Sequence, residues 1–138
     1  TQLSRAELGL GLLDKALEHA VTACNIFQKE IIKYNITSVM NPEFAAALVS
    51  KGDSLFKKNK LDEAVEAYNE AETIYFRKYG DNYRYMDDIS YLLSQGSKAA
   101  CASKNHFWKK HFYDQMIANF GTEHPRVIEA IAVCDKLE

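Results

Sequence analysis

Two histidines and a tryptophan form the densest group of residues capable of chemistry in this 138-residue sequence. His106 and His111 flank Trp108 in a segment that is otherwise basic and aromatic. This five-residue spacing turns about 140° around an α-helix, because one turn takes about 3.6 residues. The two imidazoles therefore point in different directions, whereas zinc ligands on a helix are typically three or four residues apart. We expect no metal site and no cofactor, and we interpret Trp108 as a packing residue beside a basic surface.

The three cysteines, Cys24, Cys101 and Cys134, are odd in number and far apart in the sequence. The chain does not open with a basic segment followed by an apolar one, so no secretory signal is visible. Without such a signal we expect free thiols in a reducing compartment and a cytoplasmic location. The sequence has no initiator methionine, and we expect it to be an excised part of a larger protein.

Motifs that carry catalysis or phosphate binding are absent from the sequence. It contains no nucleophile elbow, no glycine-rich phosphate loop and no paired-cysteine motif. The 17 basic and 19 acidic residues give a net charge of −2, which argues against a nucleic-acid partner. No apolar run reaches the length of a membrane span, so we expect no membrane insertion. We therefore expect a non-enzymatic protein that folds as a single domain over residues 1–138.

Apolar residues recur at intervals of three and four, which is the pattern of amphipathic helices. The clearest stripe runs from Leu61 to Tyr75, and strand-like alternation is almost absent. We therefore expect an all-α fold. Proline, glycine and polar turns divide the chain into six helical segments, with breaks at Asn41-Pro42, Lys58–Lys60, Gly80–Asn82, Ser103–Asn105 and Gly121.

Internal similarity predicts a repeated helix pair. Leu48 and Gly52 recur as Leu92 and Gly96, 44 residues later. We expect units at about 4–40, 45–80 and 86–121, followed by a terminal helix at about 125–137. Little sequence precedes Leu13, so the first helix of the first unit is either truncated or merged into one long helix. Units of this kind stack on their neighbours, because a single pair cannot bury its own apolar face.

Residues 45–78 resemble a tetratricopeptide repeat. The matching residues, large and small at the family's spacing, are Leu48, Gly52, Leu55, Ala64, Tyr68 and Ala71. The longer period and the segment 120–127 are similar to the variant found in kinesin light chains. The resemblance implies a right-handed α-solenoid of antiparallel helix pairs, in which small residues lie where two helices cross. Trp108 and Gln115 replace the alanines expected in the next unit, so its helices should pack further apart or at another angle.

In this family the first helix of each pair lines a concave groove, which holds a peptide or a partner domain. The positions that correspond to the groove are Val49, Ser50, Asp53, Phe56, Lys57, Ser90, Leu93, Ser94, Ser97 and Cys101, with Cys134 and Asp135 from the last helix. The resemblance therefore implies a protein-interaction scaffold or adaptor. The alternative is a structural spacer, or a self-association segment of a larger repeat protein.

One kind of groove does not fit the sequence. Repeats that clamp the carboxylate tail of chaperones use Lys and Asn, where this chain has Val49, Asp53 and Ser94. Asp53 would repel an acidic tail, so we expect no such clamp.

Two further clusters are interpreted as structural. The lysines near the second break alternate with acidic residues, which is typical of a solvated turn. The aromatic run is expected in the core, with any exposed part a candidate contact surface. These clusters are Lys51, Lys57, Lys58 and Lys60, and Tyr75, Phe76, Tyr79, Tyr83 and Tyr85.

Overall fold

The computed structural model describes residues 2–34, 42–79 and 85–137, and the side chains of residues 11–29, 42–76 and 85–137. Within these ranges every regular element is helical, which confirms the predicted all-α class. Six helices follow one another along the chain: α1 (Gln2–Tyr34), α2 (Pro42–Lys57), α3 (Leu61–Tyr79), α4 (Met86–Ala102), α5 (His106–Phe120) and α6 (Pro125–Leu137).

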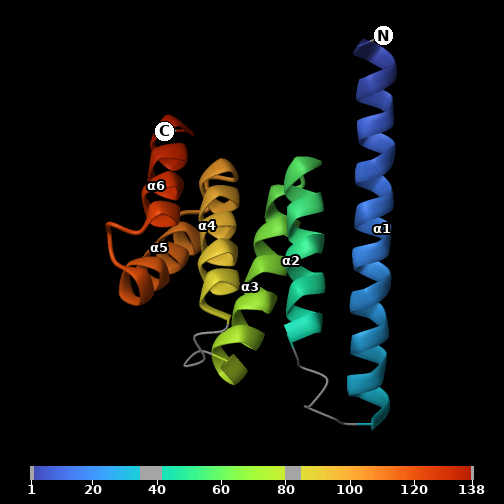
Figure 1. Ribbon diagram of the computed structural model, residues 1–138, viewed down its shortest axis with the longest axis horizontal. Helices are drawn as coiled ribbons and strands as arrows, with labels where there is room; N and C mark the ends of the chain where they lie inside the picture. The colour runs from blue at the N-terminus through green and yellow to red at the C-terminus, as the bar shows by residue number, and fades with distance from the viewer. Residues whose placement is uncertain (1, 35–41, 80–84, 138) are drawn as a thin grey trace.

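The helices form a row, with α1 at one end and α5 and α6 at the other (Figure 1). Each of the first four packs on the next, and α4 also packs on α6. A continuous core cluster runs through the row from Cys24 in α1 to Ala130 in α6. The first expected unit is one helix of 33 residues rather than a pair. Of the two alternatives for this unit, the merged helix is therefore the one that forms.

The turns after α2 and α4 have the same backbone geometry. Asn59 and Lys104 adopt left-handed conformations, with φ of 62° and 61°. In each turn, the amide after this residue donates to the carbonyl five residues before it, at 2.8 and 2.9 Å. This bonding pattern satisfies the last carbonyls of a helix and reverses the chain. In the second turn, Asn105 then caps α5 by accepting a hydrogen bond from the amide of Trp108 at 3.2 Å.

A glycine faces an aromatic ring at the crossing of α2 with α3, and again at the crossing of α4 with α5. A Cβ atom on Gly52 would lie 2.8 Å from the Tyr68 ring, and one on Gly96 would lie 2.8 Å from the Phe112 ring. Both rings are fully buried. The buried alanines beside the first crossing, Ala64 and Ala71, are also fully inaccessible, as the small-residue pattern predicts. Leu48 and Leu55 are buried on the same face of α2.

The second helix pair differs from the first in its crossing angle. Figure 1 shows α5 crossing α4 more steeply than α3 crosses α2. Trp108 and Gln115 are both half-buried in α5. The steeper crossing agrees with the expectation that these larger residues change how the helices pack.

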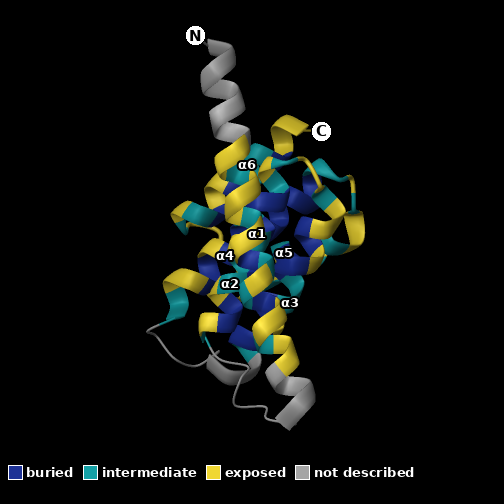
Figure 2. Cartoon of the chain, turned by 90° about the vertical axis from the view of Figure 1, so that its right-hand side faces the viewer, coloured by how far each residue is buried: buried dark blue, intermediate teal, exposed yellow. Residues whose placement is uncertain are grey.

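The inner face of α1 includes Ala20 and Cys24, which are buried, whereas Ala16 is exposed. Phe27 anchors this face through an edge-on contact with Phe44 of α2, at 5.3 Å between ring centroids. Figure 2 looks onto α1 and shows exposed residues along its outer side.

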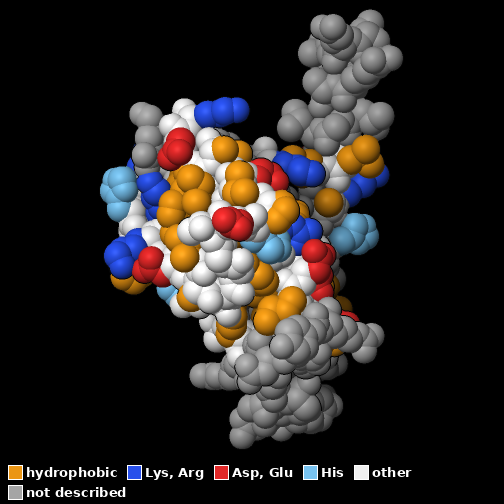
Figure 3. Space-filling model, turned by 60° about the vertical axis from the view of Figure 1, so that its left-hand side comes forward, with side chains coloured by type: hydrophobic (Ala, Val, Ile, Leu, Met, Phe, Trp, Pro, Cys, Tyr) orange, Lys and Arg blue, Asp and Glu red, His pale blue; other side chains and the backbone are white. Residues whose placement is uncertain are grey.

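Both ends of the row expose large apolar side chains. On α1 these are Leu12 and Ile26, which are 58% and 54% exposed. At the other end, Figure 3 shows apolar side chains scattered among charged ones. The exposed apolar residues of α5 and α6 are Phe107, Ile117, Ile128 and Leu137. Of the predicted aromatic run, Tyr75 is buried and Tyr85 half-buried, and the side chains of Tyr79 and Tyr83 lie outside the described residues.

Candidate partner-binding site

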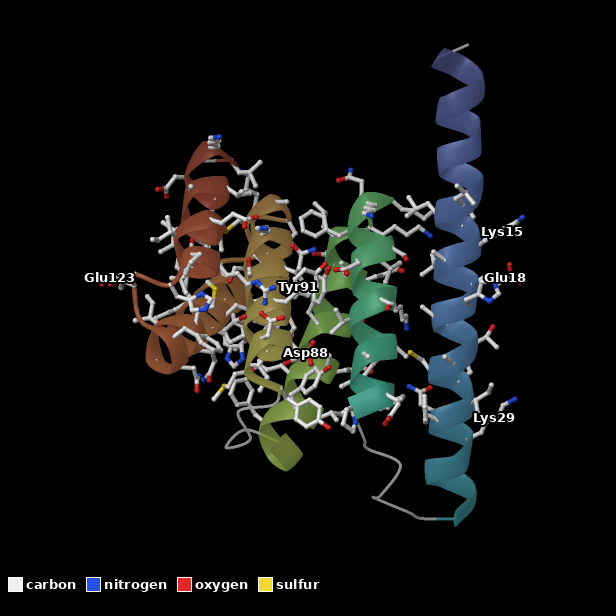
Figure 4. All side chains as sticks on the ribbon, in the orientation of Figure 1. Lys15, Glu18, Lys29, Asp88, Tyr91 and Glu123 are labelled. Carbon is white, nitrogen blue, oxygen red and sulfur yellow. A yellow bond between two sulfur atoms is a disulfide. The ribbon has the colours of Figure 1, made fainter. Side chains whose placement is uncertain are left out.

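Three of the predicted groove residues line one cavity. It has a volume of about 250 Å³ and opens between α2 and α4, with Tyr75 of α3 at its edge. Figure 4 shows its α4 members Asp88 and Tyr91 on the side of α4 that faces α2. We call it the α2–α4 cavity, and its lining residues are Ala46, Val49, Ser50, Asp53, Tyr75, Asp88 and Tyr91.

Asp53, one of the lining residues, joins three helices through its hydrogen bonds. Its Oδ1 accepts hydrogen bonds from the hydroxyl of Tyr68 in α3 and from Nε2 of Gln95 in α4, the latter at 3.0 Å. Its Oδ2 accepts from the hydroxyl of Tyr91 at 2.8 Å. These donors hold the carboxylate in one orientation, and they fix Tyr91 across the gap between α2 and α4.

The tyrosines around Asp53 remain neutral near physiological pH. Burial, followed by the hydrogen bond to Asp53, raises the pKa of Tyr91 to about 12. Burial, with the negative charge of Asp88 as the next cause, raises the pKa of Tyr75 to about 12. Burial also holds the pKa of Tyr68 above its ordinary value. The charge of the cavity therefore comes from its two carboxylates, and the phenols act as hydrogen-bond donors.

Two other predicted residues of α2 do not reach the cavity. Phe56 is half-buried and packs against the core, and Lys57 is exposed as the last residue of α2. Only the Val49, Ser50 and Asp53 part of the predicted α2 surface is therefore brought together at one site.

The α4 half of the predicted groove is not open, because α6 lies on it. α6 packs mainly against α4 and touches α5 only lightly. Nη1 of Arg126 in α6 donates to the backbone oxygen of Asp87 and, at 2.7 Å, to Oγ of Ser90, both in α4. The expectation of an accessible groove is therefore wrong for the five α4 residues, all of which are buried: Ser90, Leu93, Ser94, Ser97 and Cys101. In α6, Cys134 is also buried, and Asp135 is exposed.

The open side of α4 is carried by residues one position away from the predicted ones. A step of one residue rotates about 100° around a helix. The open side of α4 therefore carries Tyr91 and Gln95 in place of the predicted Ser90 and Ser94. The signal that could have found this side is the polar stripe that starts at Asp88 and continues through Tyr91 and Gln95 to Lys98.

The prediction of free thiols is wrong for two of the three cysteines. A disulfide joins Cys101 of α4 to Cys134 of α6, with their Cα atoms 5.5 Å apart. Cys24 is a free, buried thiol in α1. Disulfides persist in oxidising compartments, so the cysteine pattern no longer supports a cytoplasmic location.

The two histidines of the basic-aromatic segment have separate surroundings. His106 is exposed, whereas Nε2 of His111 lies 2.7 Å from Oε1 of Glu72 in α3. Glu72 is buried, and its second oxygen, Oε2, has no hydrogen-bond partner among the described residues. Burial raises the pKa of this carboxyl, and the hydrogen bond from His111 opposes that rise. The described residues contain no group of three or more His, Cys, Asp or Glu side chains that could hold a metal.

The lysine cluster at the end of α2 contacts α1. Lys58 forms an ion pair with Asp14, while Lys57 and Lys60 are exposed. The pair ties the α2–α3 turn to α1, so this lysine has a structural partner.

Comparisons of the chain with protein-family models, with curated proteins and with solved structures found no match. Over the described residues, no helix combines the length and the apolar character that crossing a bilayer requires.

Proposed function

We propose that this chain is a non-enzymatic interaction module that binds a peptide or a partner domain in the α2–α4 cavity. In this proposal it is a short right-handed α-solenoid of the tetratricopeptide type and acts as a scaffold or adaptor. The observation that carries the proposal is the cavity itself, because Val49, Ser50 and Asp53 line it together with exposed residues of the neighbouring helix α4.

The repeated local geometry supports the solenoid part of the proposal. The contact of Gly52 with Tyr68 recurs 44 residues later as that of Gly96 with Phe112. The turns that close the two helix pairs also share their left-handed residue and their hydrogen bonds. Two units that share this glycine–ring contact and this turn, although their crossing angles differ, are consistent with the stacked units of a repeat.

A site-specific cross-linker tests the location of binding. The photoreactive residue p-benzoylphenylalanine is placed at Ser50, which is exposed beside the cavity, or at Thr73, which is exposed on α3. We expect a specific covalent adduct with a partner from the Ser50 position and none from Thr73. The partner is then purified, so that its affinity can be measured directly.

Affinity measurements with that partner give the decisive comparison. Ser50→Trp should fill the cavity and weaken binding by about tenfold or more, which corresponds to a loss of about 1.4 kcal/mol. Thr73→Trp adds the same side chain elsewhere and should leave the Kd unchanged, with both folds checked by circular dichroism. Equal affinities for the two variants would show that partners bind outside this cavity.

Self-association is a second candidate function, and the exposed ends of the row favour it. Leu12 and Ile26 on α1 and Ile128 on α6 leave apolar surface at opposite ends (Figure 1). Contact between unlike ends would build a head-to-tail assembly. We expect the mass from light scattering to rise with concentration, and either Leu12→Glu or Ile128→Glu to abolish the rise. A constant monomer mass at all concentrations would eliminate this candidate.

A further inference from the structure

The geometry points to an arginine side chain of the protein partner as the group that enters the α2–α4 cavity. This inference rests on the proposed function and specifies the chemistry of the partner. It is argued from the charge of the lining, from the ring of Tyr91 and from the apolar part of the cavity wall.

The lining is negatively charged and carries no basic residue. Asp53 and Asp88 are its two charged members, and no Lys, Arg or His borders the cavity among the described residues. Asp88 is exposed at the start of α4, and no ion pair joins it to another described residue. A carboxylate can accept about four hydrogen bonds, and Asp53 receives three. Both carboxylates therefore retain capacity for a cationic donor.

Arg126, the described basic residue that contacts the Tyr91 ring, is already engaged by groups of α4. Arg126 donates to the backbone oxygen of Asp87 and to the hydroxyl of Ser90, and its Nη1 lies 3.1 Å from a carboxylate oxygen of Asp87. Its guanidinium carbon is 5.5 Å from the centroid of the Tyr91 ring. The charge of Arg126 is thus directed to Asp87, and Asp88 forms no ion pair among the described residues.

The contact with Arg126 also shows that the Tyr91 ring accepts a guanidinium group. An aromatic ring attracts cations at both faces through its quadrupole, and Arg126 occupies only one face. Tyr91 is 37% exposed, and its ring is held across the cavity by the hydrogen bond to Asp53. In this inference the guanidinium of the partner stacks on the opposite face of the ring, because Tyr91 lines the α2–α4 cavity.

The remaining wall suits the aliphatic part of an arginine. Ala46 and Val49 of α2 supply small apolar contacts along one side, beside the hydroxyl of Ser50. Arginine places its methylene groups on apolar surface while its planar head bonds a carboxylate. An ammonium group can also lie over a ring face, but only the planar guanidinium can stack on the ring while it bonds a carboxylate through two donors, which is why arginine is preferred here to lysine.

Matched peptides on the labelled full chain test this inference. The probes are two acetylated, amidated pentapeptides, Ala-Ala-X-Ala-Ala, in which X is arginine or its neutral isostere citrulline. We expect the arginine peptide to shift the NMR amide signals of Ser50, Asp53 and Tyr91 at millimolar concentration, and added salt to weaken the effect. The citrulline peptide should produce no comparable shift. Equal shifts from both peptides, or shifts elsewhere only, would overturn the inference.

The chain contains a control cavity of similar chemistry. Asp62, Glu66 and Trp108 line a cavity of about 260 Å³ between α3 and α5. Asp88→Asn should weaken binding of the arginine peptide about two- to fivefold, the range that a partly exposed ion pair supports. Glu66→Gln removes a charge from the control cavity and should have no effect. A loss in the Glu66 variant with none in the Asp88 variant would place the cation in the control cavity and overturn the inference.

The outcome can be separated from that of the proposed function. If Ser50→Trp abolishes binding of the purified partner while Asp88→Asn and added salt leave its Kd unchanged, the cavity binds partners but does not select arginine. If Ser50→Trp has no effect on the partner, the proposed function fails, whatever the peptides do.

Discussion

Replacing Gly52 by alanine tests the close helix crossing that organises the first helix pair. The new Cβ would lie 2.8 Å from Cε1 of Tyr68 and 2.9 Å from Cζ. The ring cannot easily move away, because Tyr68 is fully buried and its hydroxyl donates to Asp53. The substitution must therefore displace either the ring or the backbone of α2.

Two opposing effects set the size of the change. Alanine is preferred to glycine inside a helix by about 1 kcal/mol. Overpacking a dense core costs about 1–3 kcal/mol, so we take about 2 kcal/mol for this contact. The free energy of unfolding of Gly52→Ala should then fall by about 1 kcal/mol. The same calculation applies to Gly96→Ala, because its Cβ would meet the Phe112 ring at 2.8 Å.

Gly11→Ala is the matched control, because nothing lies within 4 Å of its added Cβ in α1. Only the higher helix propensity of alanine should act at this position, and it should raise the free energy of unfolding by up to about 1 kcal/mol. Urea denaturation of the three variants and the wild type measures these free energies. The slope m shows whether each variant exposes the same amount of surface on unfolding as the wild type. If Gly52→Ala proved as stabilising as Gly11→Ala, the close crossing described here would be wrong.

Two other predictions concern stability. Reducing the Cys101–Cys134 disulfide, which closes a loop of sequence separation 33, should lower the free energy of unfolding by about 3.7 kcal/mol on the loop-entropy relation. Urea denaturation with and without dithiothreitol measures this loss, and a double Cys→Ser variant should not respond to the reductant; an unchanged wild-type midpoint would refute the expected stabilisation. The pKa of Glu72 is raised in the folded state, so the contribution of its carboxyl to stability is present below its ordinary value of 4.5 and is lost as pH rises through the folded value. Glu72→Gln should therefore gain stability relative to the wild type as pH rises from about 4 to about 8, and a difference that does not vary with pH would contradict the raised pKa.

The covering of α4 by α6 limits where a partner can bind. The disulfide, the Arg126 contacts and the Lys98–Glu129 ion pair all join these two helices. α6 also buries Val127, Ala130 and Cys134 as its own apolar stripe. The side of α4 that faces α2 is not covered by α6, and the α2–α4 cavity lies there.

The periodic features of the chain could be predicted because they depend on neighbouring residues. The three-and-four spacing determined six helices, and the breaks at Lys58–Lys60 and Ser103–Asn105 are observed turns. The resemblance to a tetratricopeptide repeat implies that Gly52, Ala64 and Ala71 lie where two helices cross, and all three are buried. A glycine or alanine inside a helix allows a second helix to approach closely, which is a common reason for a small residue at such a position.

The α2–α4 cavity depends on contacts between residues far apart in the sequence, and the spacing of apolar residues does not reveal such contacts. Both sides of α4 carry small or polar residues, so the sequence did not distinguish the side under α6 from the side with Tyr91. The three hydrogen bonds of Asp53 come from residues 15, 38 and 42 positions away. The pairing of Cys101 with Cys134 likewise required α6 to pack on α4. Helix formation follows from local spacing, whereas the side of a helix that is covered depends on how distant helices pack, and only the tertiary structure decided that.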